Sequence, residues 1–294
     1  MIVAPTIISL REGIEAALII AIMLSYLRKT SRTDLNRYVL GGTIMAFVAS
    51  IGVAAVMALV WGAFEGPMLE VFEGSVVLIA AFLLTTMVLW MWNAGAGIAS
   101  EIEESVDKGV RRESGIGLAL LAFALVLREG VELVLFTAAL AFQEGSLTYV
   151  GVTLGLLLAT VIGVGIYQGS LRVSLKSFFN ATSVLLVLFA AGMIAYGIHE
   201  LQEAGLLLIG PIEVWNINPP LLPDGSYPLL HENGLIGGLA KALFGYNGNP
   251  SFLEVTGYIL YLVIVTVYYL RKRRPTNPDT RTTSSQETVA SVST

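Results

Sequence analysis

The chain has 294 residues, of which 55% are hydrophobic and 13% are charged, and its mean hydropathy is +0.76. A soluble domain of this size carries about a quarter charged residues, so the composition places the chain in a lipid bilayer and excludes an ordinary soluble enzyme. The chain contains no cysteine, which excludes both disulfides and thiolate metal sites.

Seven apolar runs are long enough to cross a membrane, which takes about 20 helical residues. The first run lacks a preceding basic segment and is interrupted by charges at Arg11 and Glu12, so we interpret it as a true span and not as a signal peptide. The sequence therefore predicts an all-α integral membrane protein with seven transmembrane helices. These predicted spans lie at about residues 5–27, 38–61, 74–98, 115–142, 148–168, 180–199 and 252–270.

The first and fourth predicted spans contain the same charged motif, REGIE in one and REGVE in the other. Each motif places one arginine and two glutamates on the same helix face, because these residues are one, three and four positions apart. The glycine within each motif, Gly13 or Gly130, would let another helix or an ion approach closely. The charged residues are Arg11, Glu12 and Glu15 in the first motif and Arg128, Glu129 and Glu132 in the second.

Charged side chains in the middle of a membrane span need a partner, since an unpaired ionised acid at this depth costs several kcal/mol. In one interpretation, each arginine only neutralises a glutamate of its own helix and joins the bundle together. However, two arginines and four glutamates leave a net charge of −2, which a bound cation would balance. Oxygen ligands select hard ions such as Fe³⁺, Mg²⁺, Mn²⁺ or Ca²⁺. The sequence therefore favours a cation site between the first and fourth spans.

The distribution of basic residues predicts the orientation in the membrane. Fourteen of the 17 Lys and Arg residues lie after spans 1, 3 and 5 or in the tail, all on one side of a seven-span protein. Two of the others are the motif arginines, and Lys241 alone lies on the opposite side. The positive-inside rule then puts the N-terminus outside and the C-terminus in the cytoplasm.

The spacing of the two motifs predicts an internal repeat. Three spans separate one motif from the other, so the segments 5–98 and 115–199 would cross the membrane in opposite directions. This is a 3+3 inverted-topology repeat, to which the helix at 252–270 is added. The repeats and this helix form a predicted permease domain over residues 1–272.

The external side is predicted to be acidic, a charge that attracts cations. His199, Glu200 and Glu203 share a helix face there, and both a solvated helix end and a site where the ion enters remain open interpretations. Glu73 is a second candidate for the same outer site. The Pro- and Gly-rich segment of about 200–251 predicts an external loop, in which GLIGGLAKALFG can form a short interfacial helix.

Other segments indicate packing, disorder or the absence of catalytic motifs. The methionine and aromatic residues of TMVLWMWN, residues 86–93, are interpreted as packing residues and interfacial anchors. Residues 275–294 are polar and predict a disordered cytoplasmic tail. We find no P-loop, dinucleotide fingerprint or nucleophile arrangement, so the sequence predicts neither an enzyme nor a permanently bound cofactor, and no nucleic acid as a partner.

The paired REGxE motifs, with FEGS…LTTMVLWMW and FAAGMIAYGIHELQEAG, resemble the oxidase-dependent iron transporters, the family of the yeast high-affinity iron permease and of bacterial EfeU. The resemblance covers residues 1–272. It implies import of iron, handled as Fe³⁺ after a partner has oxidised Fe²⁺ at the outer surface. It also implies that the four motif glutamates, Glu12, Glu15, Glu129 and Glu132, bind the ion, with Arg11 and Arg128 as their charge partners.

The resulting prediction is a multi-pass iron permease of the inner or plasma membrane. Its partners would be the iron ion, the lipid bilayer and an extracytoplasmic ferroxidase or iron-binding protein, because this chain has no oxidase domain. One alternative is a carrier of another divalent cation, or a proton-coupled exchanger, that uses the same carboxylates. A second alternative is a membrane assembly subunit that transports nothing. The outer cluster of the family corresponds more loosely to His199, Glu200 and Glu203.

Overall fold

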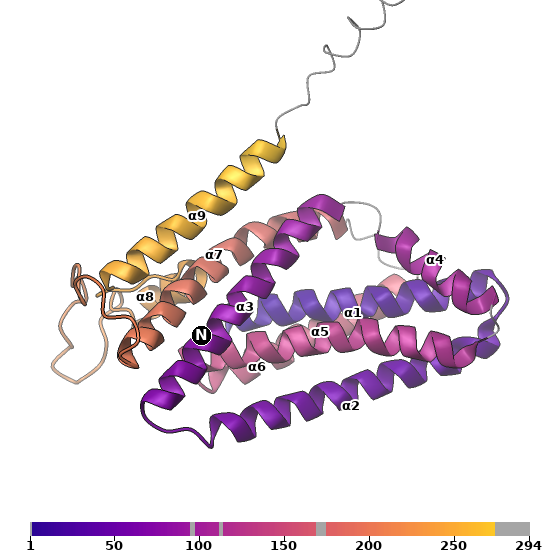
Figure 1. Ribbon diagram of the computed structural model, residues 1–294, viewed down its shortest axis with the longest axis horizontal. Helices are drawn as coiled ribbons and strands as arrows, with labels where there is room; N and C mark the ends of the chain where they lie inside the picture. Colours follow the sequence, from indigo (N-terminus) through magenta and orange to yellow (C-terminus); the bar gives the residue numbers. More distant parts are fainter. Residues whose placement is uncertain (1, 95–97, 112–113, 169–174, 274–294) are drawn as a thin grey trace, which may run out of the picture.

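The computed structural model describes residues 2–94, 98–111, 114–168 and 175–273, and over these residues it is helical without any strand (Figure 1). The predicted tail at 275–294 lies outside the described residues. The helices are α1 (Val3–Lys29), the short 3₁₀-helix η1 (Thr33–Leu35), α2 (Asn36–Trp61), α3 (Pro67–Ala94), α4 (Ile98–Arg111), α5 (Gly115–Glu144), α6 (Leu147–Tyr167), α7 (Leu175–Glu203), α8 (Leu235–Phe244) and α9 (Phe252–Arg273).

Within the described residues, each of the seven predicted segments is helical, and five of the helices are long and apolar enough to cross a membrane. These five are α2, α3, α6, α7 and α9. The remaining two long helices, α1 and α5, each carry an REGxE motif near the middle, and its three charged residues distinguish them from the other five. The chain is thus a multi-pass helical membrane protein, in which the charged motifs set α1 and α5 apart.

Besides the short η1, two α-helices of the described residues lie outside the seven predicted segments. The expected short helix in the external loop is present as α8. In contrast, α4 lies in the stretch that follows the third predicted span, where the apolar runs predict no helix. Ile102 and Val106 are buried against α1 and α5, whereas Glu103 and Glu104 are exposed. Apolar residues four positions apart form one face of a helix, and this face is what α4 buries.

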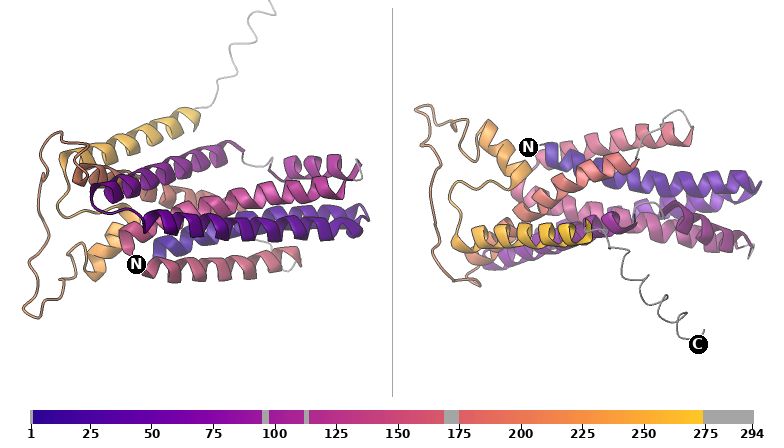
Figure 2. Two further views of the ribbon diagram at one scale, coloured as in Figure 1. Left: turned by 60° about the horizontal axis from the view of Figure 1, so that its bottom comes forward. Right: turned by 90° about the horizontal axis from the view of Figure 1, so that it is seen from above.

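The long helices pair across the two halves of the chain. The most extensive contacts join α1 to α6, α2 to α5 and α3 to α7, whereas the contact between the successive helices α1 and α2 is small. Helix α9 packs on α7, and Figure 2 shows the same bundle from two further sides. The helices α4 and α8 lie at opposite ends of the bundle (Figure 1).

The pairs α1–α6 and α2–α5 are built from matching close contacts. At each crossing a motif glycine lies against a small residue, so that an added β-carbon would collide with it: Gly13 faces Ala159, and Gly130 faces Ser50. A second glycine in each pair lies against a backbone carbonyl, Gly151 against that of Ile2 and Gly42 against that of Ala119. The residues of α1 and α5 in these contacts are 117 positions apart, and those of α2 and α6 are 109 apart. The two halves of the chain therefore repeat the same helix packing.

The charged motifs lie between two hydrophobic cores. Along α1 the first motif separates Ile8, which belongs to the first core, from Ile19, which belongs to the second. Along α5 the order is reversed, with Val126 in the second core and Phe136 in the first. The first core is formed by α1, α3, α5 and α7, and the second by α1, η1, α2, α4 and α5. Apolar packing therefore closes the bundle on both sides of the motifs.

Candidate metal site

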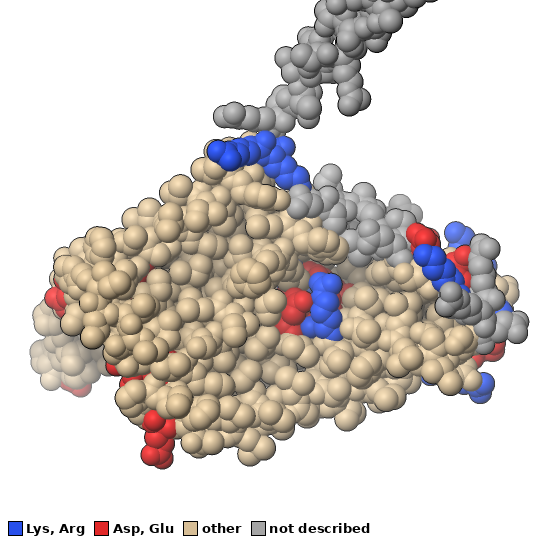
Figure 3. Space-filling model, viewed as in Figure 1, with Lys and Arg blue, Asp and Glu red and all other residues tan. Residues whose placement is uncertain are grey.

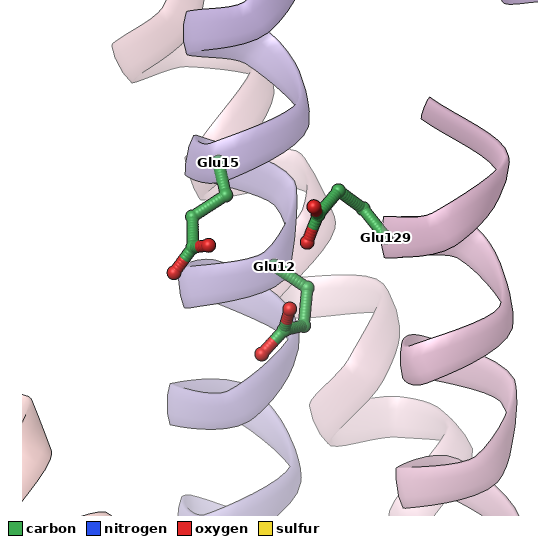
Figure 4. A group of neighbouring side chains, drawn as sticks. All are labelled: Glu12, Glu15 and Glu129. Carbon is green, nitrogen blue, oxygen red and sulfur yellow. The ribbon is translucent and has the colours of Figure 1, made fainter. Parts of the chain in front are cut away.

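Helices α1 and α5 bring three of the predicted ligands together. Glu12 and Glu15 extend from α1, and Glu129 reaches from α5 toward them (Figure 4). Each of the three offers a carboxylate oxygen that lies within 4.8 Å of those of the other two. Such a group has the size and chemistry to hold a metal ion. Glu132, the fourth predicted ligand, lies beside Arg128 and is not a member of this close group.

Several oxygens of these glutamates are buried and have no hydrogen-bond partner. Glu12 is only 1% exposed and Glu129 only 4% exposed. A buried carboxylate oxygen without a donor loses the hydration it has in water and gains nothing in return. The oxygens that accept no hydrogen bond are Oε1 and Oε2 of Glu12, Oε1 of Glu15, Oε2 of Glu129 and Oε2 of Glu132, although Oε1 of Glu12 and Oε1 of Glu15 lie within ion-pair distance of Arg11.

The two arginines have equivalent ion pairs but unequal surroundings. In each motif the arginine Nε lies close to the glutamate four residues later, at 3.2 Å from Arg11 to Glu15 and at 3.0 Å from Arg128 to Glu132. The Arg128 Nε–H donates a hydrogen bond to Glu132, whereas the Arg11 Nε–H is not aligned for one. Arg11 is 0% exposed, and the Arg128 side chain is 50% exposed. The site therefore has a closed half at α1 and an open half at α5.

The open half is visible on the surface of the molecule. Figure 3 shows a small group of charged side chains in a hollow near the middle of one face, where the surrounding surface is uncharged. Besides Arg128, the side chains of Glu15 and Glu132 are slightly exposed, at 13% and 14%. The carboxylates are thus reached from the side of Arg128.

The guanidinium groups of both arginines contact helix α3. The Nη1 and Nη2 atoms of Arg11 donate to the sulfur atoms of Met87, at 2.9 Å, and of Met91. The guanidinium carbon of Arg128 lies 5.9 Å from the ring centre of Trp90. Sequence reasoning interpreted these residues as packing residues and interfacial anchors and missed their position at the site. Their spacing places them on one face of α3, but nothing in the sequence says which helix that face meets.

The outer candidates form one loose group whose direct contacts reach two different helices. The ring of His199 lies between two carboxylates, with its Nε2 at 3.2 Å from Glu203 and its Nδ1 at 3.1 Å from Glu254. Glu200 is buried and faces α3, where Glu73 accepts a hydrogen bond from the indole N–H of Trp61. Glu200 also interacts with the charges of Glu73, Glu203 and His199, so the four predicted residues share one electrostatic environment.

Glu254, at the start of α9, is the residue of this region that sequence reasoning missed. It is 3% exposed and accepts hydrogen bonds from the side chain of Asn247 and the backbone N–H of Ser251, besides its contact with His199. Since its oxygens are satisfied by these groups, it joins α9 to the end of α7. Nothing in the sequence distinguishes it from the other acids predicted on the external side.

The comparison with known proteins agrees with the resemblance of the motifs. The model of the iron permease FTR1 family matches residues 2–275, which is nearly the whole chain. The chain belongs to this family. It is therefore a multi-pass protein of the cell membrane.

Individual relatives match over most of their length. Two proteins named ferrous iron permease EfeU, from Escherichia coli strain 536 and from Yersinia pestis, are 35% and 33% identical to this chain. The alignments cover 90% and 92% of this chain and 94% of each relative. A protein of E. coli K12 named putative inactive ferrous iron permease EfeU is 35% identical over 90% of this chain and 94% of its own length. No solved structure matches the chain.

Proposed function

We propose that this protein imports iron across the cell membrane through the carboxylate site between α1 and α5. The observation that carries the proposal is the set of buried glutamate oxygens without hydrogen-bond partners, contributed by two helices of a chain that belongs to an iron permease family. A cation placed among these oxygens would supply the interaction that they lack.

The arrangement of the arginines argues against the purely structural interpretation of the motifs. If each arginine only neutralised its glutamates, its terminal nitrogens would bind carboxylate oxygens, the strongest acceptors nearby. Instead, those of Arg11 donate to two thioethers, and Nη1 reaches Glu12 only as an ion pair at 3.6 Å, so neither oxygen of Glu12 accepts a hydrogen bond. The site therefore retains acceptor groups and negative charge for an ion.

We propose that the ion reaches the site as Fe³⁺, after Fe²⁺ has given one electron to an oxidase partner at the outer surface. The relatives are named ferrous iron permeases, which fits Fe²⁺ as the ion supplied to the system. Carboxylate oxygens are hard donors and suit Fe³⁺ well. Uptake into proteoliposomes from Fe²⁺ alone, Fe²⁺ with a ferroxidase, and Fe³⁺ tests this step. We expect uptake to be slowest from Fe²⁺ alone. Equal uptake rates from Fe²⁺ with and without the ferroxidase would contradict the proposed oxidation step.

Transport through this site requires access from each side in turn, and the two hydrophobic cores are the proposed gates. The matching contacts of α1–α6 and α2–α5 support an inverted repeat, in which one half rocks against the other. Opening the first core would expose the motifs to the side of α8, and opening the second core to the side of α4. With the N-terminus outside, these sides are the exterior and the cytoplasm.

The decisive experiment replaces the glutamates singly by glutamine, as in Glu12→Gln, Glu15→Gln, Glu129→Gln and Glu132→Gln. Each change keeps the size of the side chain and removes one negative charge, so iron binding and uptake should fall while folded protein stays in the membrane. Glu104→Gln is the matched control, because Glu104 is an exposed acid on α4 that pairs with Lys108. Four variants that bind and transport iron like the parent would show that the motifs are not the iron site.

Competition with other ions tests the alternative of a carrier for another divalent cation. Excess Mn²⁺, Mg²⁺ or Ca²⁺ should compete only weakly with iron for binding to the purified parent protein. Tighter binding of one of these ions than of either form of iron would favour the alternative carrier. A protein that binds iron but moves no ion into proteoliposomes would favour the assembly subunit.

A further inference from the structure

One turn of α3 faces both arginines of the motifs. Met87 and Met91 contact the terminal nitrogens of Arg11, and Trp90, between them in the sequence, lies against the guanidinium of Arg128. This turn contributes no carboxylate, and its residues belong to neither motif. It nevertheless contacts the guanidinium groups of both positively charged side chains.

The contacts of Arg11 are unusual for a fully buried guanidinium. A thioether sulfur is a weak hydrogen-bond acceptor, whereas a carboxylate is a strong one. The Nη1 atom of Arg11 lies 2.9 Å from the sulfur of Met87 but 3.6 Å from the nearest oxygen of Glu12. The arginine thus directs its terminal N–H groups to the weak acceptors, and Glu12 keeps both oxygens free.

We propose that Met87 and Met91 are positioning residues that hold the guanidinium of Arg11 away from Glu12 and so keep Glu12 available to the metal ion. The two sulfur atoms accept hydrogen bonds from the terminal nitrogens and belong to α3, a helix that contributes none of the four motif carboxylates. Arg11 still lowers the electrostatic cost of the buried acids, since charge acts over several ångströms without a hydrogen bond. The inference rests on the proposed function, because it assigns Glu12 to the ion.

The open half of the site, at α5, depends less on acceptors from α3. The guanidinium of Arg128 already donates from Nε to a strong acceptor, Glu132, and the ring of Trp90 adds a cation–π contact. Arg11 has no exposed surface, and its terminal nitrogens depend on protein acceptors. Removing the acceptors on α3 should therefore affect Glu12 and the α1 half of the site most strongly.

The test replaces both methionines by leucine, which has a similar volume but no acceptor atom. In Met87→Leu/Met91→Leu the guanidinium should turn to Glu12 and compete with the ion. We expect the dissociation constant for iron of the purified protein to rise roughly tenfold, as for the loss of one or two hydrogen bonds to a charged group. Met68→Leu, at the far end of the same helix and exposed, is the matched control. Met87→Gln restores an acceptor of similar length and should bind iron like the parent.

Adding Arg11→Gln to the double leucine variant separates positioning from other roles. If the methionines act through Arg11, removing its charge should return iron binding to within a fewfold of the parent. Unchanged binding in the double leucine variant would overturn the inference. So would a loss that Arg11→Gln does not restore, because the thioethers would then act directly on the ion or on packing.

The same measurements separate this inference from the proposed function. In one outcome, the parent protein binds iron more tightly than Glu12→Gln and yet no more tightly than the double leucine variant. This outcome would contradict the positioning role alone and leave the proposed site intact. If the parent binds no iron at all, the proposed site and the positioning role fall together.

Discussion

Arg11 and Arg128 occupy nearly identical sequence motifs. They differ in burial, however, so their replacement should have unequal effects on the stability of the protein. Removing one partner of a fully buried ion pair leaves an uncompensated charge and costs about 3 kcal/mol or more, and the loss is smaller where the remaining groups can reach the surface. Arg11→Gln should therefore lower the melting temperature of the iron-free protein more than Arg128→Gln, since Arg128 is half exposed and its partner Glu132 is slightly exposed. Thermal unfolding in detergent measures this difference.

Iron should reverse the effect of Arg11→Gln, because the variant site is more negative and binds a cation at least as well as the parent. The melting temperature of Arg11→Gln should then rise more on addition of iron than that of the parent. Equal changes of melting temperature in Arg11→Gln and Arg128→Gln, both without and with iron, would contradict the expectation that burial makes the two replacements unequal.

Glu254 offers a second contrast between buried and exposed acids. Glu254→Gln removes the charge that accepts from Asn247 and Ser251 and contacts His199, so the end of α7 should loosen from the start of α9. We expect a lower melting temperature and faster cleavage of the 204–251 segment by protease. Glu203→Gln is the control, because Glu203 is more than half exposed and should leave both measurements near those of the parent.

At the residue level, the sequence predicted which residues carry the charges of the site, but not which other side chains contact them. The two motifs named both arginines and all four glutamates, of which three form the close group. The sequence could not identify Met87 and Met91 as neighbours of Arg11, because helical spacing assigns residues to a face but does not say what that face contacts. The partners of His199 were incomplete for the same reason, since Glu254 is 55 residues away along the chain.

At the level of the helices, neighbouring glycines give a controlled test of close packing. A β-carbon on Gly42 would collide with the carbonyl of Ala119 on α5, whereas one on Gly41 would have nothing within 4 Å. Gly42→Leu should therefore push α2 away from α5 and sharply reduce the yield of folded protein, and Gly41→Leu should not. The elution profile of the two variants from a size-exclusion column provides the measurement. Similar profiles would mean that α2 and α5 do not pack as closely as described.

The long helices could be predicted from apolar runs, because burial in lipid demands about 20 apolar residues in succession. Helix α4 could not be found this way, because charged residues fill its exposed face. The spacing of Ile102 and Val106 was the available signal, and a search for helical periodicity within the loops would have used it. Helix α3 begins at Pro67, seven residues before the predicted start, since a helix can extend beyond its apolar run.

For the whole molecule, the position of the lysines makes the predicted orientation testable. Lys241 belongs to α8 at one end of the bundle, and Lys108 belongs to α4 at the other. An amine reagent that does not cross membranes should label Lys241 in intact cells, and Lys29 and Lys108 only after the cells are opened. Labelling of Lys108 in intact cells would contradict the orientation with the N-terminus outside.

The arrangement of the helices was only partly accessible from the sequence. The spacing of the two motifs predicted two related halves, and the matching glycine contacts agree with that prediction. The pairing of α1 with α6 and of α2 with α5 was not predicted, because the contacts join residues more than 70 positions apart. Apolar helices can pack on one another in many combinations, and hydropathy alone does not distinguish these combinations.

This cross-pairing has a consequence for how the protein is made. Most helical neighbours in proteins are also neighbours along the chain, but here α1 meets its main partner, α6, only after more than 140 residues have been synthesised. During that interval a newly inserted α1 lies in the membrane without α6, and its charged face also waits for α3 and α5, which carry Met87 and Glu129. The amino-terminal half should therefore be a substrate for membrane chaperones and quality-control proteases. Two separately expressed halves should each be short-lived and should survive only when they are produced in the same cell.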